Sequence, residues 1–169
     1  DPQLRTLDVY VVPLDNATMA RRVSLALGPD TDPIWSPDGT RLVYRSVQNS
    51  IASIYARALD PLTAPEQEII KTGADLSPWD WQGNTLFYSV AAPGTARLDL
   101  WMGDLRTNRT TQLTKSGFTA SDAHLSPDGA WLTYVSEESG QQEVYVEPWP
   151  KRAPRVRVSF GGGRRPQWA

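Results

Sequence analysis

The chain contains no cysteine and only one histidine among its 169 residues. The absence of cysteine excludes disulfide bridges and thiolate metal ligands. A zinc site needs three or four protein ligands, so His124 has too few companions, and we predict no metal and no cofactor. No apolar run of 18 residues occurs, and we therefore predict no direct membrane insertion. The chain does not open with a signal-peptide pattern, and we interpret Asp1 as the start of an excised piece or a mature form.

Net charge is also small, at -2 at pH 7, although it is distributed unevenly. Six basic residues and no acidic residue follow Glu147, whereas the first 150 residues carry 11 basic against 19 acidic side chains. A total so close to zero gives no general attraction to nucleic acid or to a membrane surface. We interpret the basic end as a solvated outer edge rather than a nucleic-acid patch, and we predict no nucleic-acid partner.

Catalytic motifs are missing as well. The sequence has no Gly-x-Ser-x-Gly nucleophile motif and no phosphate-binding loop of the Gly-x4-Gly-Lys-Ser/Thr type. His124 follows Asp122 by two residues at the expected start of a strand, where an ordinary loop pair is a better interpretation than catalysis. The run 161–165 offers glycine amides and two arginines to an anion, but we favour a crossover between repeats. We predict no catalytic residue in this chain.

The sequence does contain a repeated motif. Residues 35–44 read WSPDGTRLVY, residues 79–88 and 125–134 follow the same pattern, and a fourth copy begins at Trp168. The first positions of these copies are 44, 46 and 43 residues apart. A period of this length indicates one supersecondary unit repeated in an array.

Each repeat divides into four short runs rich in Val, Ile, Tyr, Trp and Thr, which is typical of β-strands. Pro37 and Pro127 favour the second position of a turn, and Gly39 and Gly129 supply the positive φ of a tight hairpin. The stretch 64–71 has some helical character, and we interpret it as the approach to a strand. The sequence thus predicts an all-β fold with strands at 7–13, 21–25, 32–36, 41–46, 53–59, 67–72, around 79, 85–89, 98–105, 110–114, 123–126, 131–136, 143–149 and 155–159.

Aromatic residues recur at fixed places in the repeat. A ligand-stacking platform is one interpretation, but a site is normally built once, so recurrence favours packing between neighbouring sheets. The three shared positions are those of Trp35, Trp79 and Trp168, of Tyr44, Tyr88 and Tyr134, and of Tyr10, Tyr55, Trp101 and Tyr145.

These residues carry a resemblance to a known family. Residues 33–44 (PIWSPDGTRLVY) resemble the WD-like repeat of TolB-like β-propellers at every fixed position. Residues 126–146, followed by three glycines at 161–163, are similar to the C-terminal sensor propellers of bacterial serine/threonine kinases. The resemblance covers nearly the whole chain. It implies a β-propeller, in which blades of four antiparallel strands surround a channel and the first strand of each blade is innermost.

On this basis we expect a single partial propeller with 15 strands, or about four blades. The repeat units are a half blade at 1–28, blades at 29–73, 74–117 and 118–160, and the start of another at 161–169. We favour a piece of a larger propeller, because the phrase at Trp168 breaks off, over a small ring closed by joining its end strands. Open blade edges in such an arc would allow self-association.

Connections between blades are expected to converge at one mouth of the channel, and they carry a mixture of acids and arginines. Loops gathered on a rigid scaffold are the usual place for sites on such folds, although ordinary solvated loops are the alternative. The residues placed there are Asp30, Asp32, Asp75, Asp122, His124, Arg164 and Arg165.

Two functions remain open. The first is a non-catalytic binding or sensor module for a protein, a peptide or another ligand, extracytoplasmic or periplasmic, in a bacterial signalling or envelope protein. The alternative is the gating propeller of a prolyl-oligopeptidase-like serine peptidase whose catalytic domain is absent from this chain. The resemblance implies both, and fold analogy alone does not choose between them.

Overall fold

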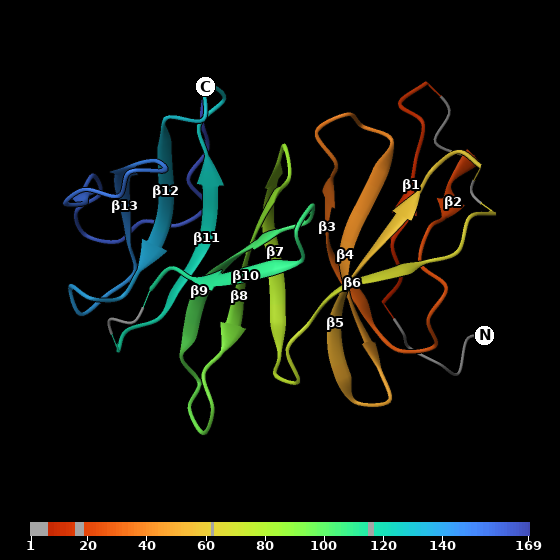
Figure 1. Ribbon diagram of the computed structural model, residues 1–169, viewed down its shortest axis with the longest axis horizontal. Helices are drawn as coiled ribbons and strands as arrows, with labels where there is room; N and C mark the ends of the chain where they lie inside the picture. The colour runs from red at the N-terminus through yellow and green to blue at the C-terminus, as the bar shows by residue number, and fades with distance from the viewer. Residues whose placement is uncertain (1–6, 16–18, 62, 115–116) are drawn as a thin grey trace. The chain divides into compact units, whose positions relative to one another are not determined.

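The computed structural model describes residues 7–15, 19–61, 63–114 and 117–169. These residues form three antiparallel sheets of four strands and one sheet of two, and each sheet follows chain order (Figure 1). The expected all-β fold of four-stranded meanders is confirmed. The strands are β1 (Tyr10–Val11), β2 (Arg21–Arg22), β3 (Asp30–Trp35), β4 (Arg41–Gln48), β5 (Ile51–Ala58), β6 (Gln67–Lys71), β7 (Leu76–Gln82), β8 (Thr85–Ala91), β9 (Leu98–Asp104), β10 (Arg109–Gln112), β11 (Ala120–Leu125), β12 (Trp131–Ser136), β13 (Glu143–Pro148) and β14 (Val156–Arg157).

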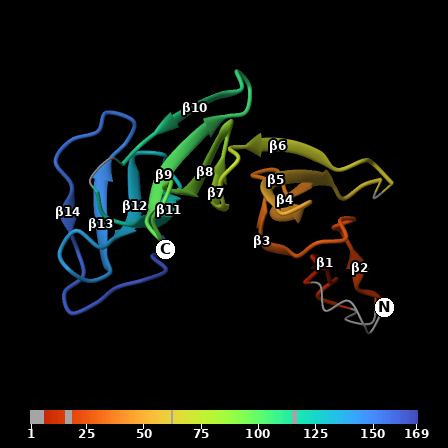
Figure 2. The same ribbon diagram turned by 90° about the horizontal axis from the view of Figure 1, so that it is seen from below.

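The chain divides into two compact units, residues 1–78 and 79–169, and the boundary falls within β7. The first unit contains the half blade β1–β2 and the complete blade β3–β6 (Figure 2). Its core joins Val9 and Val23 of the half blade to Leu42 and Tyr44 of β4, all at most 4% exposed. Because both faces of β4 are covered, its apolar residues form a continuous run rather than an alternating one.

The second unit packs β11 against β8 and β9 of the preceding sheet. Its core contains Phe87, Leu100, Leu132 and Tyr134, each at most 1% exposed. Phe87 meets Trp149 edge to face, with ring centroids 5.3 Å apart and planes at 71°. That geometry suits the aromatic quadrupole and fixes the outer part of one sheet against the next.

The Ser-Pro-Asp-Gly turn folds for a local electrostatic reason. In β3–β4 the carboxylate of Asp38 accepts the hydroxyl of Ser36 at 2.6 Å and the amide of Thr40 at 3.0 Å. These hydrogen bonds lower the pKa of Asp38 to about 2. Asp128 makes the equivalent contacts in β11–β12, which explains why this phrase recurs between the first two strands of a blade.

Two of the innermost strands, β3 and β11, carry a bulge at the same repeat position. The register with the second strand shifts between Thr31 and Ile34 in β3 and between Ser121 and His124 in β11. Asp32 and Asp122 lie inside these bulges with φ of 54° and 56°. Aspartate tolerates this left-handed conformation better than most residues, so the acid at this place has a structural role in the strand.

A hydrogen bond to a Ser or Thr hydroxyl recurs at the outermost strand of three blades, counting the half blade. The hydroxyls of Ser24, Thr114 and Ser159 accept the backbone N–H groups of Val9, Leu100 and Val144 at 3.0, 2.9 and 2.8 Å. Each pair joins the third strand of a blade to the residues that follow or continue the fourth. The side chain thereby replaces a ladder hydrogen bond where the short outer strand ends.

The aromatic prediction is confirmed best at the tyrosine position of the second strand. Tyr44, Tyr88 and Tyr134 are at most 1% exposed, which fits packing between sheets. Trp35 and Tyr10 are 52% and 53% exposed, so packing does not account for every copy. The stretch 64–71 ends in strand β6, as predicted.

Fourteen strands form in the described residues, and the fifteenth expected at Trp168 does not. The indole of Trp168 instead donates to the carbonyl of His124 at 3.1 Å. A strand requires a hydrogen-bonded neighbouring backbone, and this segment has none within the described ranges. That part of the chain also has no helix long and apolar enough to span a membrane.

Candidate functional site

The sequence-predicted residues Asp122, His124 and Arg165 come together in the second unit. One oxygen of Asp122 lies 3.2 Å from Nε2 of His124, and its other oxygen accepts the backbone N–H of Arg165 at 2.6 Å. The Asp122 and His124 side chains are 14% and 22% exposed, so both remain reachable by a partner. Arg165 also has a positive φ, 52°, and lies three residues before Trp168, just as Asp122 precedes Leu125 by three. The contact therefore links one repeat to the next at equivalent positions.

Beside this cluster lies a shallow hollow of about 430 Å³. The exposed guanidinium of Arg164 borders it and forms no ion pair within the described residues. The hollow is lined by Gln141, Gln142, Gly161, Gly162, Gly163 and Arg164. It offers a polar surface with one unopposed positive charge.

The glycine run beside the hollow already holds an anion that belongs to the chain. The buried carboxylate of Glu143 accepts the amides of Gly161 and Gly162, both at 2.9 Å, together with the hydroxyl of Ser159. The Ser159 and backbone hydrogen bonds lower the pKa of Glu143 to about 2, so it is ionised at neutral pH. These amides are therefore occupied, which supports the crossover interpretation of this run over anion binding.

The remaining predicted site residues belong to the first unit. Asp75 pairs with Arg45, with an N–O distance of 2.6 Å, and its side chain is 64% exposed. Asp32 accepts the hydroxyl of Thr31 at 3.2 Å. Asp30 differs from both, because it is only 2% exposed and is therefore not an accessible mouth residue. Burial raises the pKa of Asp30 above its ordinary value, against the opposing effect of the Ser46 and Ser24 hydroxyls.

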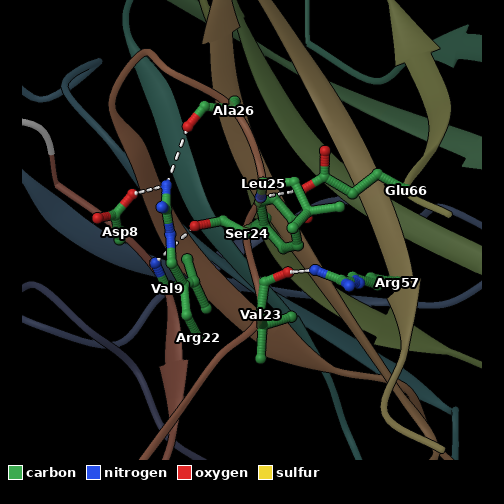
Figure 3. Close-up of polar contacts among 10 residues, drawn as sticks. Asp8, Val9, Arg22, Val23, Ser24, Leu25, Ala26, Arg57 and Glu66 are labelled. Atoms are coloured by element: carbon green, nitrogen blue, oxygen red, sulfur yellow. Dashed lines mark hydrogen bonds and ion pairs between the residues drawn. The ribbon is translucent and has the colours of Figure 1, made fainter. Parts of the chain in front are cut away.

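Sequence reasoning missed the polar contacts that join the half blade to the next sheet. Figure 3 shows Arg57 of β5 donating to the carbonyl of Val23, and Glu66 accepting the backbone N–H of Leu25 at 2.5 Å. Glu66 also accepts the hydroxyl of Tyr44 at 2.5 Å. The sequence did carry one signal for this junction, which is a single arginine in a strand of mostly small and apolar residues. In the structure Arg57 is 5% exposed, and a buried charge needs polar partners.

The ring of His124 and the nearby hydroxyl of Thr133 make separate contacts. The ring contacts the Asp122 carboxylate, whereas the hydroxyl of Thr133 donates to the backbone carbonyl of His124 at 3.2 Å. Acyl transfer needs a hydroxyl or thiol that hydrogen-bonds the base itself. Across the described ranges, no group of three or more His, Asp or Glu residues is placed to hold a metal ion.

No protein-family model matches the chain. Among solved structures it is similar to TolB from Acinetobacter baumannii, with a TM-score of 0.77 and 21% identity over 92% of this chain and 38% of that one. It is also similar to a putative TolB from Agrobacterium tumefaciens, with a TM-score of 0.77 and 19% identity over 90% of this chain and 55% of that one. A structure from a study of two prolyl endopeptidases gives a TM-score of 0.66 and 16% identity over 91% of this chain and 25% of that one.

These likenesses define the class of fold, which is a β-propeller. The arrangement resembles the TolB propeller in particular, as the repeated Trp-Ser-Pro-Asp-Gly phrase indicates. The chain spans about half or less of the length of each of these relatives.

Proposed function

We propose that this chain is a non-catalytic binding module that holds a protein or peptide partner at the Asp122 cluster. The observation that carries the proposal is the juxtaposition of Asp122, His124 and Arg165 beside the hollow bordered by Arg164. A partner carboxylate can pair with Arg164, and a partner donor can reach the exposed part of Asp122. Strand β11 holds Asp122 and His124, and the hydrogen bond from Arg165 to Asp122 restrains the segment that carries Arg164, which lowers the entropy lost when a partner binds.

The wider setting belongs to the same proposal. The sequence resemblance and the TolB likeness support a bacterial envelope or signalling protein, with this module on the extracytoplasmic or periplasmic side. A sensor role of the kind found on bacterial serine/threonine kinases fits the repeat at 126–146. Fractionation of cells that express the intact parent protein tests the location, and recovery of the module in the cytoplasm would contradict it.

Peptide selection on the immobilised chain tests the binding site. We expect selected peptides to be rich in acidic residues and to lose at least 10-fold in affinity with Arg164→Glu, because the charge that pairs with them is reversed. Asp122→Asn should weaken binding less. Arg109→Glu, on the outer strand β10, is the matched control because it makes the same charge change elsewhere. Equal binding by all variants would exclude this site.

The second candidate, a gating propeller of a serine peptidase, is favoured by the likeness to the prolyl endopeptidase structure. The sequence that adjoins this chain in its parent gene distinguishes the two. A hydrolase domain with Gly-x-Ser-x-Gly after Ala169 supports the peptidase, whereas a kinase domain and a membrane span before residue 1 support the sensor. In either case we expect the chain alone to show no peptide hydrolysis.

A further inference from the structure

A second cavity, away from the Asp122 cluster, lies between the last residues of one sheet and the face of the next. Its volume is about 210 Å³. It is lined by Leu113, Thr114, Tyr134, Ser136, Glu138, Arg152 and Arg155. Tyr134 is 1% exposed, and its hydroxyl lies beside the Arg155 guanidinium but has no hydrogen-bond acceptor within the described residues. Because a guanidinium cannot accept a hydrogen bond, the O–H group of this buried residue still needs an acceptor in the cavity.

The first unit shows what occupies the equivalent place there. Three residues of the cavity have counterparts 90 positions earlier in the chain, at the same places in the repeat. Thr114 corresponds to Ser24, Tyr134 to Tyr44 and Ser136 to Ser46. In the first unit this place contains two carboxylates of the chain. Glu66 accepts the Tyr44 hydroxyl at 2.5 Å, and the buried Asp30 lies beside Ser24 and Ser46.

Both carboxylates are replaced in the second unit. The residue 90 positions after Asp30 is Ala120. Gln67 pairs with Ala56 in β6–β5, and Val156 pairs with Val146 in β14–β13 at the same repeat position. The residues that precede these two outer-strand positions therefore correspond, and they are Glu66 and Arg155. One acid is thus replaced by a methyl group and the other by a guanidinium, so the second unit lacks both carboxylates.

The cations at the cavity retain hydrogen-bonding capacity. Arg155 donates through Nε and Nη2 to Glu138 and lies over the Tyr145 ring, 5.9 Å from its centroid. Arg152 donates through Nε to Glu147 and through Nη1 to the carbonyl of Leu113. Each guanidinium thus has one further NH₂ group beyond these bonds, and Arg155 also interacts with the Tyr134 hydroxyl. Burial raises the pKa of Tyr134 to about 12, so its hydroxyl remains a donor at neutral pH.

We propose that this cavity binds a small carboxylate, which takes the place that Glu66 and Asp30 fill in the first unit. The Tyr134 hydroxyl donates to one carboxylate oxygen, and the remaining NH₂ groups of Arg152 and Arg155 approach the other. Planar guanidinium groups suit carboxylates. The volume limits the ligand to a few non-hydrogen atoms, and such a ligand binds in the millimolar range.

A titration of the 169-residue chain with acetate, followed by amide and arginine Nε NMR signals, tests the proposal. We expect saturable shifts at Thr114, Ser136 and Arg155, and no saturation with acetamide, which has the same shape without the charge. Tyr134→Phe should weaken acetate binding about 10-fold, because it removes a hydrogen bond to a charged group. Tyr88→Phe is the matched control, since Tyr88 holds the same repeat position in the preceding blade and does not line this cavity.

Ala120→Asp provides an independent test, because it restores the acid found at the equivalent place in the first unit. We expect the new carboxylate to compete with acetate and abolish its binding. If Tyr134→Phe does not fold, Arg155→Lys serves in its place, because it keeps the charge and loses the planar donors. Shifts that do not saturate, an equal response to acetamide or sulfate, or an equal loss with Tyr88→Phe would each overturn the carboxylate assignment.

Discussion

The backbone N–H of Arg165 donates to the carboxylate of Asp122 at 2.6 Å, and both residues have left-handed φ values at the same place in successive repeats. Asp122 thus serves two purposes. It adopts the conformation that the bulge requires, and it provides the acceptor for the segment that begins the following repeat. This pairing orders Arg164 and Arg165 beside the hollow, where the proposed partner binds.

Removal of that acceptor should release the segment after Gly163. We expect Asp122→Ala to lower the free energy of unfolding by about 1 kcal/mol and to speed exchange of the Arg165 amide about 10-fold. Asp122→Asn should have a smaller effect, because asparagine keeps a side-chain oxygen and tolerates positive φ. Hydrogen exchange read by NMR measures the difference. Unchanged protection at Arg165 in the alanine variant would show that another contact holds this segment.

The Glu143 carboxylate makes the folded protein sensitive to acid. Its pKa is about 2 in the folded chain, against an ordinary value near 4.5, because Ser159 and two glycine amides stabilise the ionised form. A depressed pKa contributes stability above the unfolded value, and this contribution is lost as pH falls from about 4.5 towards 2. Urea unfolding midpoints at several pH values should fall over this window. Glu143→Gln should flatten that dependence, whereas Glu137→Gln, the control, should retain it.

Ser126 organises the turn between β11 and β12. Its hydroxyl donates to Asp128 at 2.5 Å and accepts the amides of Ala130 and Trp131 at 3.1 and 2.9 Å. Because Ser126 is only 3% exposed, water does not replace these bonds readily. We expect Ser126→Ala to cost about 2 kcal/mol in chemical denaturation, and the exposed Ser139→Ala to change stability by less than about 0.5 kcal/mol. Similar values for the two variants would mean that the turn holds without its hydroxyl.

Gly28 allows a close approach of two backbones in the first unit. A Cβ at this position would lie 1.8 Å from the carbonyl oxygen of Val47, which cannot move away without disturbing β4. We expect Gly28→Ala to destabilise the chain by about 3 kcal/mol or more, as severe overpacking does. A Cβ at Gly94 would meet open space, and the positive φ is the only strain. We therefore expect Gly94→Ala to lower the free energy of unfolding by about 1 kcal/mol. Thermal unfolding of the two variants makes the comparison, and a Gly28→Ala chain as stable as the parent would refute the clash.

Much of this architecture could be predicted from residue order, because its determinants are local and repeated. The Pro-Asp-Gly turn fixes the first hairpin of a blade, and the period positions the next one. The buried tyrosines at 44, 88 and 134 followed from recurrence alone. The bulge at Asp122 did not, since nothing in a single aspartate distinguishes a left-handed strand residue from a solvated loop residue.

The candidate site was predicted in part for the same reason. The repeat places Asp122 and Arg165 at equivalent positions before successive inner strands, and these residues and His124 meet in space. Asp30 has similar neighbours in the sequence but is buried. The role of Glu143 depends on Gly161 and Gly162, about 18 residues further along, and such a contact has no periodic signature. The carboxylates that the Tyr134 cavity lacks become apparent only when the two units are compared position by position.

The hydroxyl contacts of Ser24, Thr114 and Ser159 lie wholly inside individual sheets. The half blade and the blades β7–β10 and β11–β14 therefore each hold their outer strand by a contact within the sheet. A protein engineer can exploit this by exchanging blades between related arrays as cassettes, with the cut placed before the bulged inner strand. Such hybrids would keep these contacts in the outer strands, whereas the aromatic contacts and the polar contacts between sheets would need to be matched again.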